Sequence, residues 1–265
     1  MPPLALVGNL SFDLIDGGSP QPGGAPFHCA RAWRALHVRA TTIAHCARED
    51  ERIFRRGFAR LGVPVHFASS RETTTFAFRY ENEQRIMDVV RMGDAWSPAD
   101  VADVPYGAWV HVAPLLRGDF PARTLAAVAR GRRVSFDAQG LTRVRANGPL
   151  RLEPEPELAS LLRHVSILKL AEEEAVALVG GIEPEALAAL GPPEVIVTFG
   201  SRGSLVVTSG NATEVAARQI ETDPTGSGDV FAAAYLASRA SGHAPVSAAR
   251  RATGIVSALL SGRTS

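Results

Sequence analysis

The chain has 265 residues, of which 46% are hydrophobic and 21% charged, a composition typical of a globular protein with a large core. Its 28 basic and 27 acidic residues give a net charge of +1 without a basic stripe, so no nucleic-acid partner is expected. Cys29 and Cys46 form no CxxC motif or ligand cluster, and no charged, apolar leader opens the sequence. We therefore expect a single domain over residues 1–265, cytoplasmic and without membrane association.

Short apolar runs alternate with helix-period segments along the chain. Buried strands are predicted at residues 4–7, 39–44, 108–112, 133–136, 165–168 and 195–199, and helices at residues 26–36, 49–61, 121–130 and 172–179. A hairpin at residues 204–207 and 213–217 precedes two further helices, at residues 227–241 and 244–260. This alternation predicts an α/β fold, with a doubly wound, mostly parallel sheet that carries helices on both faces.

One segment interrupts the alternation. Residues 73–80 and 85–91 are rich in β-branched and aromatic side chains and are separated by the polar run Glu81-Asn82-Glu83-Gln84, which is typical of a β-hairpin. A hairpin inserted in a doubly wound fold would form a small lid at about residues 73–91. The alternative is an antiparallel edge of the main sheet.

The strongest local signal is the run Asp223-Pro224-Thr225-Gly226-Ser227-Gly228-Asp229, directly before an apolar helix. Glycines at a helix start leave backbone N–H groups uncrowded, and the helix dipole favours an anion there. A carboxylate in the same turn would repel a phosphate unless it accepts a proton from an attacking hydroxyl. From this pattern, Asp229 is either such a base or a simple helix-capping residue.

Other nucleotide-binding and catalytic motifs do not occur in the sequence. There is no GxxxxGK[ST], GxSxG or HExxH, and Gly226-Ser227-Gly228 lies too near the C-terminus for a dinucleotide-binding fingerprint. P-loop, hydrolase, zinc-protease and dehydrogenase functions are therefore disfavoured.

The run at residues 223–229 resembles the C-terminal signature of the ribokinase-like (PfkB) carbohydrate kinases, roughly D-[TP]-T-G-A-G-D, with Ser227 in place of the usual Ala. Three other segments resemble the family in the same order along the chain. They are Gly8-Asn9 followed by Asp13, the glycine signature Gly23-Gly24-Ala25-Pro26, and the strand and turn at residues 195–203. The similarity spans nearly the whole chain.

The resemblance implies a kinase that transfers the γ-phosphoryl group of ATP to a sugar or polyol, with Mg²⁺ as the metal. Asp229 would be the catalytic base, and the amides of Gly226, Ser227 and Gly228 would form the anion hole. The implied substrate-binding residues are Asn9, Asp13, Gly24, His28, Gln139 and Arg143, and the implied nucleotide-binding residues are Lys169, Thr198, Gly200, Gly203, Thr225 and Thr253. Glu174 would serve the metal.

The sequence departs from the family pattern at two places. The family's Asn-x-x-Glu reads Ala171-Glu172-Glu173-Glu174, so that the Asn is lost while Glu174 is retained, and we expect metal binding through water. His28 stands where the glycine signature usually has a hydroxyl-binding Asn; it is either a substrate ligand or a structural histidine.

Two basic residues near these motifs are open to two interpretations. Lys169, the only lysine in the chain, either places its charge on phosphate or is a surface lysine near a helix start. Arg143 follows Asp137-Ala138-Gln139 and either clamps phosphate or forms an ordinary loop salt bridge.

Because the stretch at residues 14–22 is short, we expect the lid to consist mainly of the hairpin. A small lid of this kind suits a compact acceptor. Together with the signature segments, it resembles the myo-inositol kinases of the family, so we expect a cyclic polyol such as myo-inositol, acted on by a monomer or homodimer. The alternative function is a catalytically silent nucleotide- or sugar-binding regulator on the same fold. Retention of Asp229 argues against that alternative.

Overall fold

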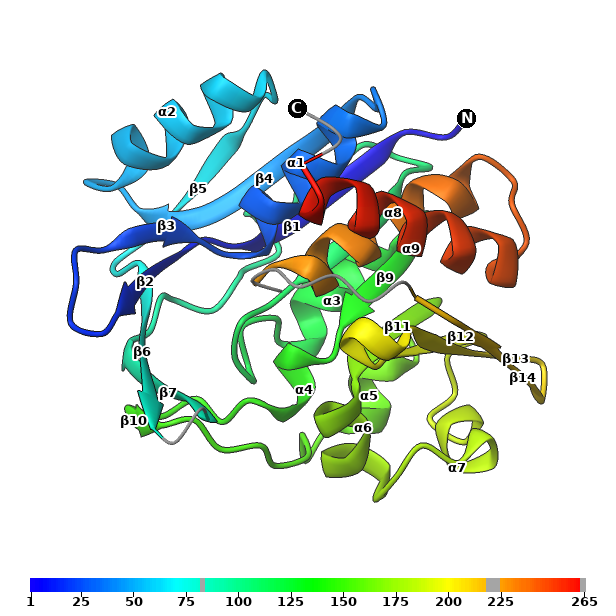
Figure 1. Cartoon of the computed structure of the whole chain (residues 1–265). Coiled ribbons are helices and arrows are strands. Elements are labelled where there is room, and N and C mark those ends of the chain that lie inside the picture. The colour runs from blue at the N-terminus through cyan, green and yellow to red at the C-terminus, as the bar shows by residue number, and fades with distance from the viewer. Residues whose placement is uncertain (82–83, 218–224, 263–265) are drawn as a thin grey trace.

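The computed structural model of the chain describes residues 1–81, 84–217 and 225–262, and within them the strands form two separate sheets (Figure 1). The larger sheet has the order β14-β13-β12-β11-β9-β8-β1-β4-β5. Its strands are β1 (Leu4–Asn9), β4 (Ala40–Ala47), β5 (His66–Ser70), β8 (Trp109–Ala113), β9 (Arg133–Asp137), β11 (Ile167–Ala171), β12 (Glu194–Thr198), β13 (Ser204–Thr208) and β14 (Asn211–Val215).

In this sheet, β5, β4, β1, β8, β9, β11 and β12 pair in parallel with their neighbours. The antiparallel pairs are β12 with β13 and β13 with β14. The parallel strands other than the edge strand β5 are short and largely buried, because helices cover both of their faces. The predicted doubly wound, mostly parallel sheet is therefore confirmed.

The helices are α1 (Ala25–Ala35), α2 (Glu51–Leu61), α3 (Ala122–Ala129), α4 (Gln139–Thr142), α5 (Leu158–Leu162), α6 (Glu172–Val179), α7 (Pro184–Ala188), α8 (Ser227–Ala240) and α9 (Pro245–Leu260), with a 3-10 turn, η1, at Gly200–Arg202. Successive strand residues point to opposite faces, and the two faces bury different helices. On β1, Val7 packs in the cluster that holds α3, α5, α6 and α7, whereas Leu4 packs against α8 and α9. In the described part of the chain, no helix is long and apolar enough to cross a bilayer.

The smaller sheet has the order β10-β7-β6-β2-β3. Its strands are β2 (Ser11–Ile15), β3 (Gln21–Gly23), β6 (Thr74–Glu81), β7 (Gln84–Arg91) and β10 (Gly148–Pro149). The antiparallel pair β6 and β7 is the hairpin expected from the sequence, and it is not an edge of the main sheet. This smaller sheet, here called the lid sheet, contains more strands than the expected hairpin, because β2 pairs in parallel with β6 and β3 pairs with β2. The stretch at residues 14–22 therefore contributes strand residues to the same sheet as the hairpin.

The strand order reverses at β1, which lies between β8 and β4. In doubly wound sheets the crevice beyond the carboxyl ends of the strands at such a point binds ligands. In this chain β2 continues directly from β1 into the lid sheet, so that the lid stands beside this crevice (Figure 1).

Candidate active site

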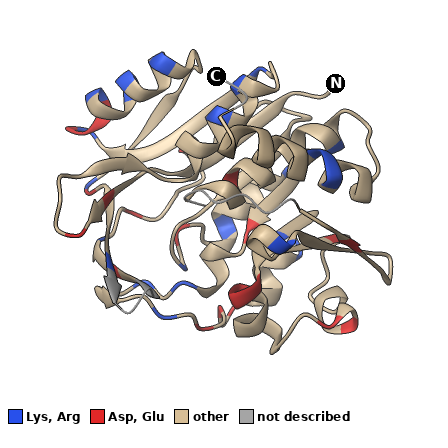
Figure 2. Ribbon diagram, in the orientation of Figure 1, with Lys and Arg blue, Asp and Glu red and all other residues tan. Residues whose placement is uncertain are grey.

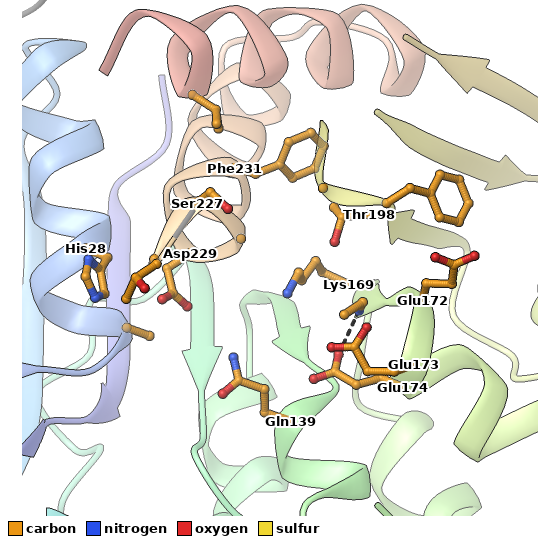
Figure 3. Close-up of a pocket in the computed structure, with 18 of the residues that line it drawn as sticks. His28, Gln139, Lys169, Glu172, Glu173, Glu174, Thr198, Ser227, Asp229 and Phe231 are labelled. Carbon is orange, nitrogen blue, oxygen red and sulfur yellow. Dashed lines mark hydrogen bonds between the residues drawn. The ribbon is translucent and has the colours of Figure 1, made fainter. Parts of the chain in front are cut away.

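A cavity of about 560 Å³ occupies the crevice between the lid sheet, the carboxyl ends of the main strands, and helices α8 and α9 (Figure 3). Segments that lie far apart in the sequence meet here. With the exception of Asn9, all residues singled out from the sequence line it: Asp13, Gly24, His28, Gln139, Arg143, Lys169, Glu174, Thr198, Gly200, Gly203, Thr225, Gly226, Ser227, Gly228, Asp229 and Thr253. Asp223 and Pro224 of the signature lie outside the described residues.

Asn9 is held by the protein itself. It is buried at the end of β1, and its Oδ1 accepts a hydrogen bond of 2.9 Å from Nε1 of Trp96. The structure therefore gives this side chain a structural partner, and its predicted contact with substrate remains a prediction.

The lid end of the cavity carries Asp13 and His28 on neighbouring segments. Oδ1 of Asp13 accepts a hydrogen bond of 3.0 Å from Oγ of Ser11. Gly24 precedes α1 with φ +95°, and a Cβ there would lie 2.6 Å from the carbonyl oxygen of Asn9. Only glycine fits this position, which explains why the chain can turn from the lid into α1 so close to the cavity.

The glycine turn before α8 is closely packed as well. Gly226 has φ +76°, and a Cβ on it would lie 2.2 Å from Nδ1 of His28, so the imidazole lies directly against this turn. The first intrahelical bond of α8 runs from the amide of Val230 to the carbonyl of Gly226. The preceding amides, of Ser227, Gly228 and Asp229, therefore have no acceptor within the helix and are available to an anion.

Asp229 lies in the first turn of α8 and points into the cavity (Figure 3). Its Oδ1 is inaccessible to solvent and has no hydrogen-bond partner in the described part of the chain. Burial, reinforced by the negative charge of Asp137, raises the pKa of Asp229 to about 7, although the charge of Lys169 opposes the shift. A carboxyl with such a pKa exchanges a proton readily near neutral pH, as a general base must.

Glu174 is a second buried carboxyl beside the cavity, 2% exposed, on the first turn of α6. Its Oε2 accepts a hydrogen bond of 2.7 Å from the amide of Ala171, which caps the helix. Burial raises the pKa of Glu174 to about 7. Acidic residues gather in this first helical turn (Figure 2).

Magnesium would have few direct ligands here. No cluster of three or more His, Cys, Asp or Glu side chains that could hold a metal occurs in the parts of the chain that the structure describes. Mg²⁺ commonly keeps several waters and binds one or two carboxylates together with substrate phosphates. The cavity fits that mode, with Glu174 as the carboxylate that would hold the water shell of the metal.

A buried ion pair lies at the floor of the cavity. Nζ of Lys169, in the middle of β11, is 3.1 Å from Oδ2 of Asp137, at the end of β9. Burial would lower the pKa of Lys169, but the charges of Asp137, Glu174 and Asp229 outweigh this effect and hold the pKa above its usual value. The interpretation of Lys169 as a surface lysine was therefore wrong, since the residue is 4% exposed.

The opposite end of the cavity is apolar. It lies between η1 and α9 and is lined by Phe199, Ala217, Phe231, Val256 and Leu260. Gly203 has φ +110°, and a Cβ on it would meet the carbonyl oxygen of Val215 at 2.0 Å, so the tight turn after η1 requires glycine. This slot can accept a flat apolar group.

Three apolar residues of the lid line the cavity and were not singled out from the sequence. Phe76 and Phe78 alternate along β6, and Phe78 pairs with Met87 of β7, so all three point to the face that lines the cavity, where Leu115 joins them. The alternation of large apolar residues in the predicted hairpin was the available signal. The role of Asp137 had no signal in the sequence, because its partner is 32 residues away.

Comparison with known proteins identifies the family. The model of the pfkB family carbohydrate kinases matches residues 16–263. A pyrophosphate-dependent kinase of the ribokinase family, solved with a pyrophosphate analogue and myo-inositol, has 26% identity to this chain and a TM-score of 0.86, over 97% of this chain and 95% of that one. Fructokinase from Vibrio cholerae O395, in its apo form, has 26% identity and a TM-score of 0.72, over 99% of both chains.

Ribokinase from Thermotoga maritima, at 16% identity and a TM-score of 0.70 over 98% of this chain and 93% of that one, supports the fold alone. The family match covers far more than half of the chain, and the signature before α8 lies within it. The chain is therefore a member of the pfkB family of carbohydrate kinases and has the ribokinase-like fold.

Proposed function

We propose that the chain is a kinase that transfers the terminal phosphoryl group of ATP to a hydroxyl of a cyclic polyol, with myo-inositol as the first candidate. The observation that carries this proposal is Oδ1 of Asp229, which is buried and has no hydrogen-bond partner among the described residues, beside the α8 amides that have no acceptor within the helix. A hydroxyl placed between Asp229 and these amides would give its proton to the carboxylate as it attacks the phosphoryl group.

The protein contributes mainly position and charge to such a reaction. The amides of Ser227 and Gly228 would stabilise negative charge on the transferred group, since they are fixed before the reaction begins. Mg²⁺, when bound, would neutralise charge on the phosphate oxygens, and Glu174 would hold its water shell. Asp13 would orient the acceptor through charge-assisted hydrogen bonds to its hydroxyls.

The cyclic polyol is supported by the shape and polarity of the lid end. Asp13, His28 and Gln139 supply polar groups, and Phe76 and Phe78 supply aromatic rings from the lid sheet, where Asp13 is the register partner of Phe76. A ring with hydroxyls around its rim and C–H bonds on its faces matches such a pocket. Two similar structures, at TM-scores of 0.86 and 26% identity, are of kinases described with myo-inositol or as acting on it.

ATP as the donor is supported by the apolar slot at the far end, where Phe199, Val256 and Leu260 could enclose an adenine ring. Pyrophosphate is the second candidate donor, because two similar structures, at TM-scores of 0.86 and 0.85, belong to pyrophosphate-dependent kinases. Pyrophosphate would bind at the amides of Ser227, Gly228 and Asp229, here called the amide cradle, and leave the slot empty.

Steady-state kinetics with each donor test the proposal. The acceptors are myo-inositol, other inositols, ribose, fructose and adenosine, and product is followed by ³¹P NMR so that both donors are measured in the same way. The proposal predicts the highest kcat/KM for an inositol; a higher value for ribose, fructose or adenosine would reject the polyol. No turnover of any acceptor with either donor, despite donor binding, would favour the silent regulator.

A substitution that fills the apolar slot distinguishes ATP from pyrophosphate as the donor. In Val256→Phe the larger side chain would occupy the space proposed for adenine, so KM for ATP should rise at least about tenfold while that for pyrophosphate stays the same. Gly254→Ala, on the same helix but with nothing within 4 Å of its added Cβ, is the matched control. If wild-type protein turns over pyrophosphate but not ATP, the ATP assignment is wrong.

A further inference from the structure

A second cavity, of about 360 Å³, adjoins the active-site cavity and is here called the side cavity. Four residues line both cavities: Met87, Arg143, Glu173 and Glu174. Met87 is the register partner of Phe78 on the lid sheet, whereas the residues of the apolar slot line only the first cavity. The two cavities therefore meet beside the lid sheet, away from the end proposed for adenine.

The border between the cavities lies close to the acceptor end of the active site. Gln139, which lines the acceptor end, begins the short helix α4, and Arg143 follows its last residue. The amide of Arg143 donates a hydrogen bond of 3.0 Å to the carbonyl of Gln139, so the two residues are one helical turn apart. A group attached to the rim of a bound polyol can therefore reach the side cavity.

Backbone hydrogen bonds hold the walls of the side cavity. The amide of Leu150 donates to the carbonyl of Met87 at 2.9 Å, and β10 pairs with β7 next to this bond. The amide of Glu153 donates to the carbonyl of Thr142 at 2.8 Å. The segment 142–153 is thus fixed to the lid sheet and to the end of α4, and the side cavity is formed before any ligand binds, as is usual for small-molecule sites.

The lining of the side cavity suits an uncharged ring that carries hydroxyls. Its apolar surface comes from Ile86, Pro149, Leu150 and Leu152, on which the C–H faces of a sugar ring can pack. Its charged groups, within the described residues, are two carboxyls and one guanidinium. These groups can form charge-assisted hydrogen bonds with hydroxyls, but they give no excess of positive charge that would favour an anion.

We propose that the side cavity is an accessory subsite for a neutral sugar ring attached to the acceptor, so that the preferred acceptor is a glycosylated cyclic polyol rather than the free polyol. This inference rests on the proposed function for the identity of the polyol. The second ring lies away from the reacting hydroxyl, so it contributes equally to the binding of ground state and transition state. It should therefore lower KM and leave kcat nearly unchanged.

Acceptor kinetics with the unaltered protein provide the first test. Inositols that carry one hexose, attached at each hydroxyl in turn, are compared with free myo-inositol at the same donor concentration. At least one of them should have a KM at least about tenfold lower than that of free myo-inositol, because apolar contacts of even one methylene can be worth this factor. If every glycosylated inositol has an equal or higher KM, the side cavity is only an opening to solvent and the proposal is wrong.

Two tryptophan variants of the same strand then locate the effect. Ile86→Trp fills the side cavity from its wall, because Ile86 lines this cavity and not the first one. It should lower the ratio of kcat/KM for the glycosylated acceptor to that for free myo-inositol at least about tenfold. The matched control is Val90→Trp, four residues further along β7, at a position that is 40% exposed and lines neither cavity. An equal ratio in the two variants would overturn the proposal.

Binding measurements distinguish failure of this inference from failure of the proposed function. Calorimetry with the glycosylated inositol, without donor, should show weaker binding to Ile86→Trp than to Val90→Trp. If the wild-type protein phosphorylates no polyol but this difference is observed, the proposed function fails and the subsite stands. If free myo-inositol is phosphorylated and the second ring improves neither KM nor binding, the proposed function stands and the subsite is refuted.

Discussion

The replacement Asp229→Asn separates the proposed catalytic role of this carboxyl from any structural one. The amide has nearly the same shape but cannot accept a proton from a hydroxyl. We expect kcat to fall at least about a hundredfold, the usual scale for loss of a general base. Donor binding should be retained, because the amides of the α8 start remain in place.

The same substitution should change how stability depends on pH. On folding, the pKa of Asp229 rises from 3.8 to about 7, so the folded protein binds more protons than the unfolded chain between these values. The free energy of unfolding therefore falls as pH rises through this window. The decrease reaches about 4 kcal/mol when the carboxyl is fully ionised in the folded protein. Asn has no such penalty.

The stability difference between Asp229→Asn and wild type is compared at two pH values, because the effect of the substitution on packing is the same at both. From the same pKa values, the penalty is about 2 kcal/mol larger at pH 8.5 than at pH 5.5, and the stability of Asp229→Asn relative to wild type should increase by this amount. Urea unfolding at both pH values measures it, with the exposed Asp103→Asn as the control. A stability difference between variant and wild type that does not change with pH would refute the raised pKa of Asp229. A near-normal kcat of the variant would refute its role as general base.

Three further substitutions test other parts of the site. Gly228→Val should abolish turnover, because its side chain would meet the ammonium of Lys169, whereas Gly254→Val, in open space, should remain active; an active Gly228→Val enzyme would contradict the cradle. Asp13→Ala should raise KM for the acceptor at least about tenfold and leave donor KM nearly unchanged, in steady-state assays with each substrate varied. Glu174→Gln should raise the Mg²⁺ concentration needed for half-maximal activity, and an unchanged Mg²⁺ titration would exclude its role at the metal.

The elements that the sequence predicted best are those whose signal is local. The strands of the main sheet are short apolar runs, and the glycine turn before α8 is a contiguous signature, so both could be located without tertiary information. The edge strand β5, His66–Ser70, was missed because it lacks an apolar run and depends on its pairing with β4. Strand β2 of the lid sheet was missed for the same reason, because it depends on its pairing with β6, which is distant in the sequence.

The site shows the same division. The residues of the cradle follow one another in the chain and were all found, but the partner of Asn9 could not be, because Trp96 is 87 residues away. The pairing of Lys169 with Asp137 likewise depends on the parallel neighbours β9 and β11, whose order in the sheet is not written in either segment. A spacing in the sequence identifies a motif, whereas the burial that changes its chemistry comes from the fold.

Burial is also the feature that connects the stability of this cavity to its function. Two carboxyls, Asp229 and Glu174, have their pKa values raised to about 7, and each therefore destabilises the folded protein when it is ionised. Perturbed groups of this kind gather at sites where proton transfer or anion binding requires them. Their concentration at the carboxyl end of β9 and β11 and the start of α8 therefore argues for catalysis at this crevice independently of the family signature.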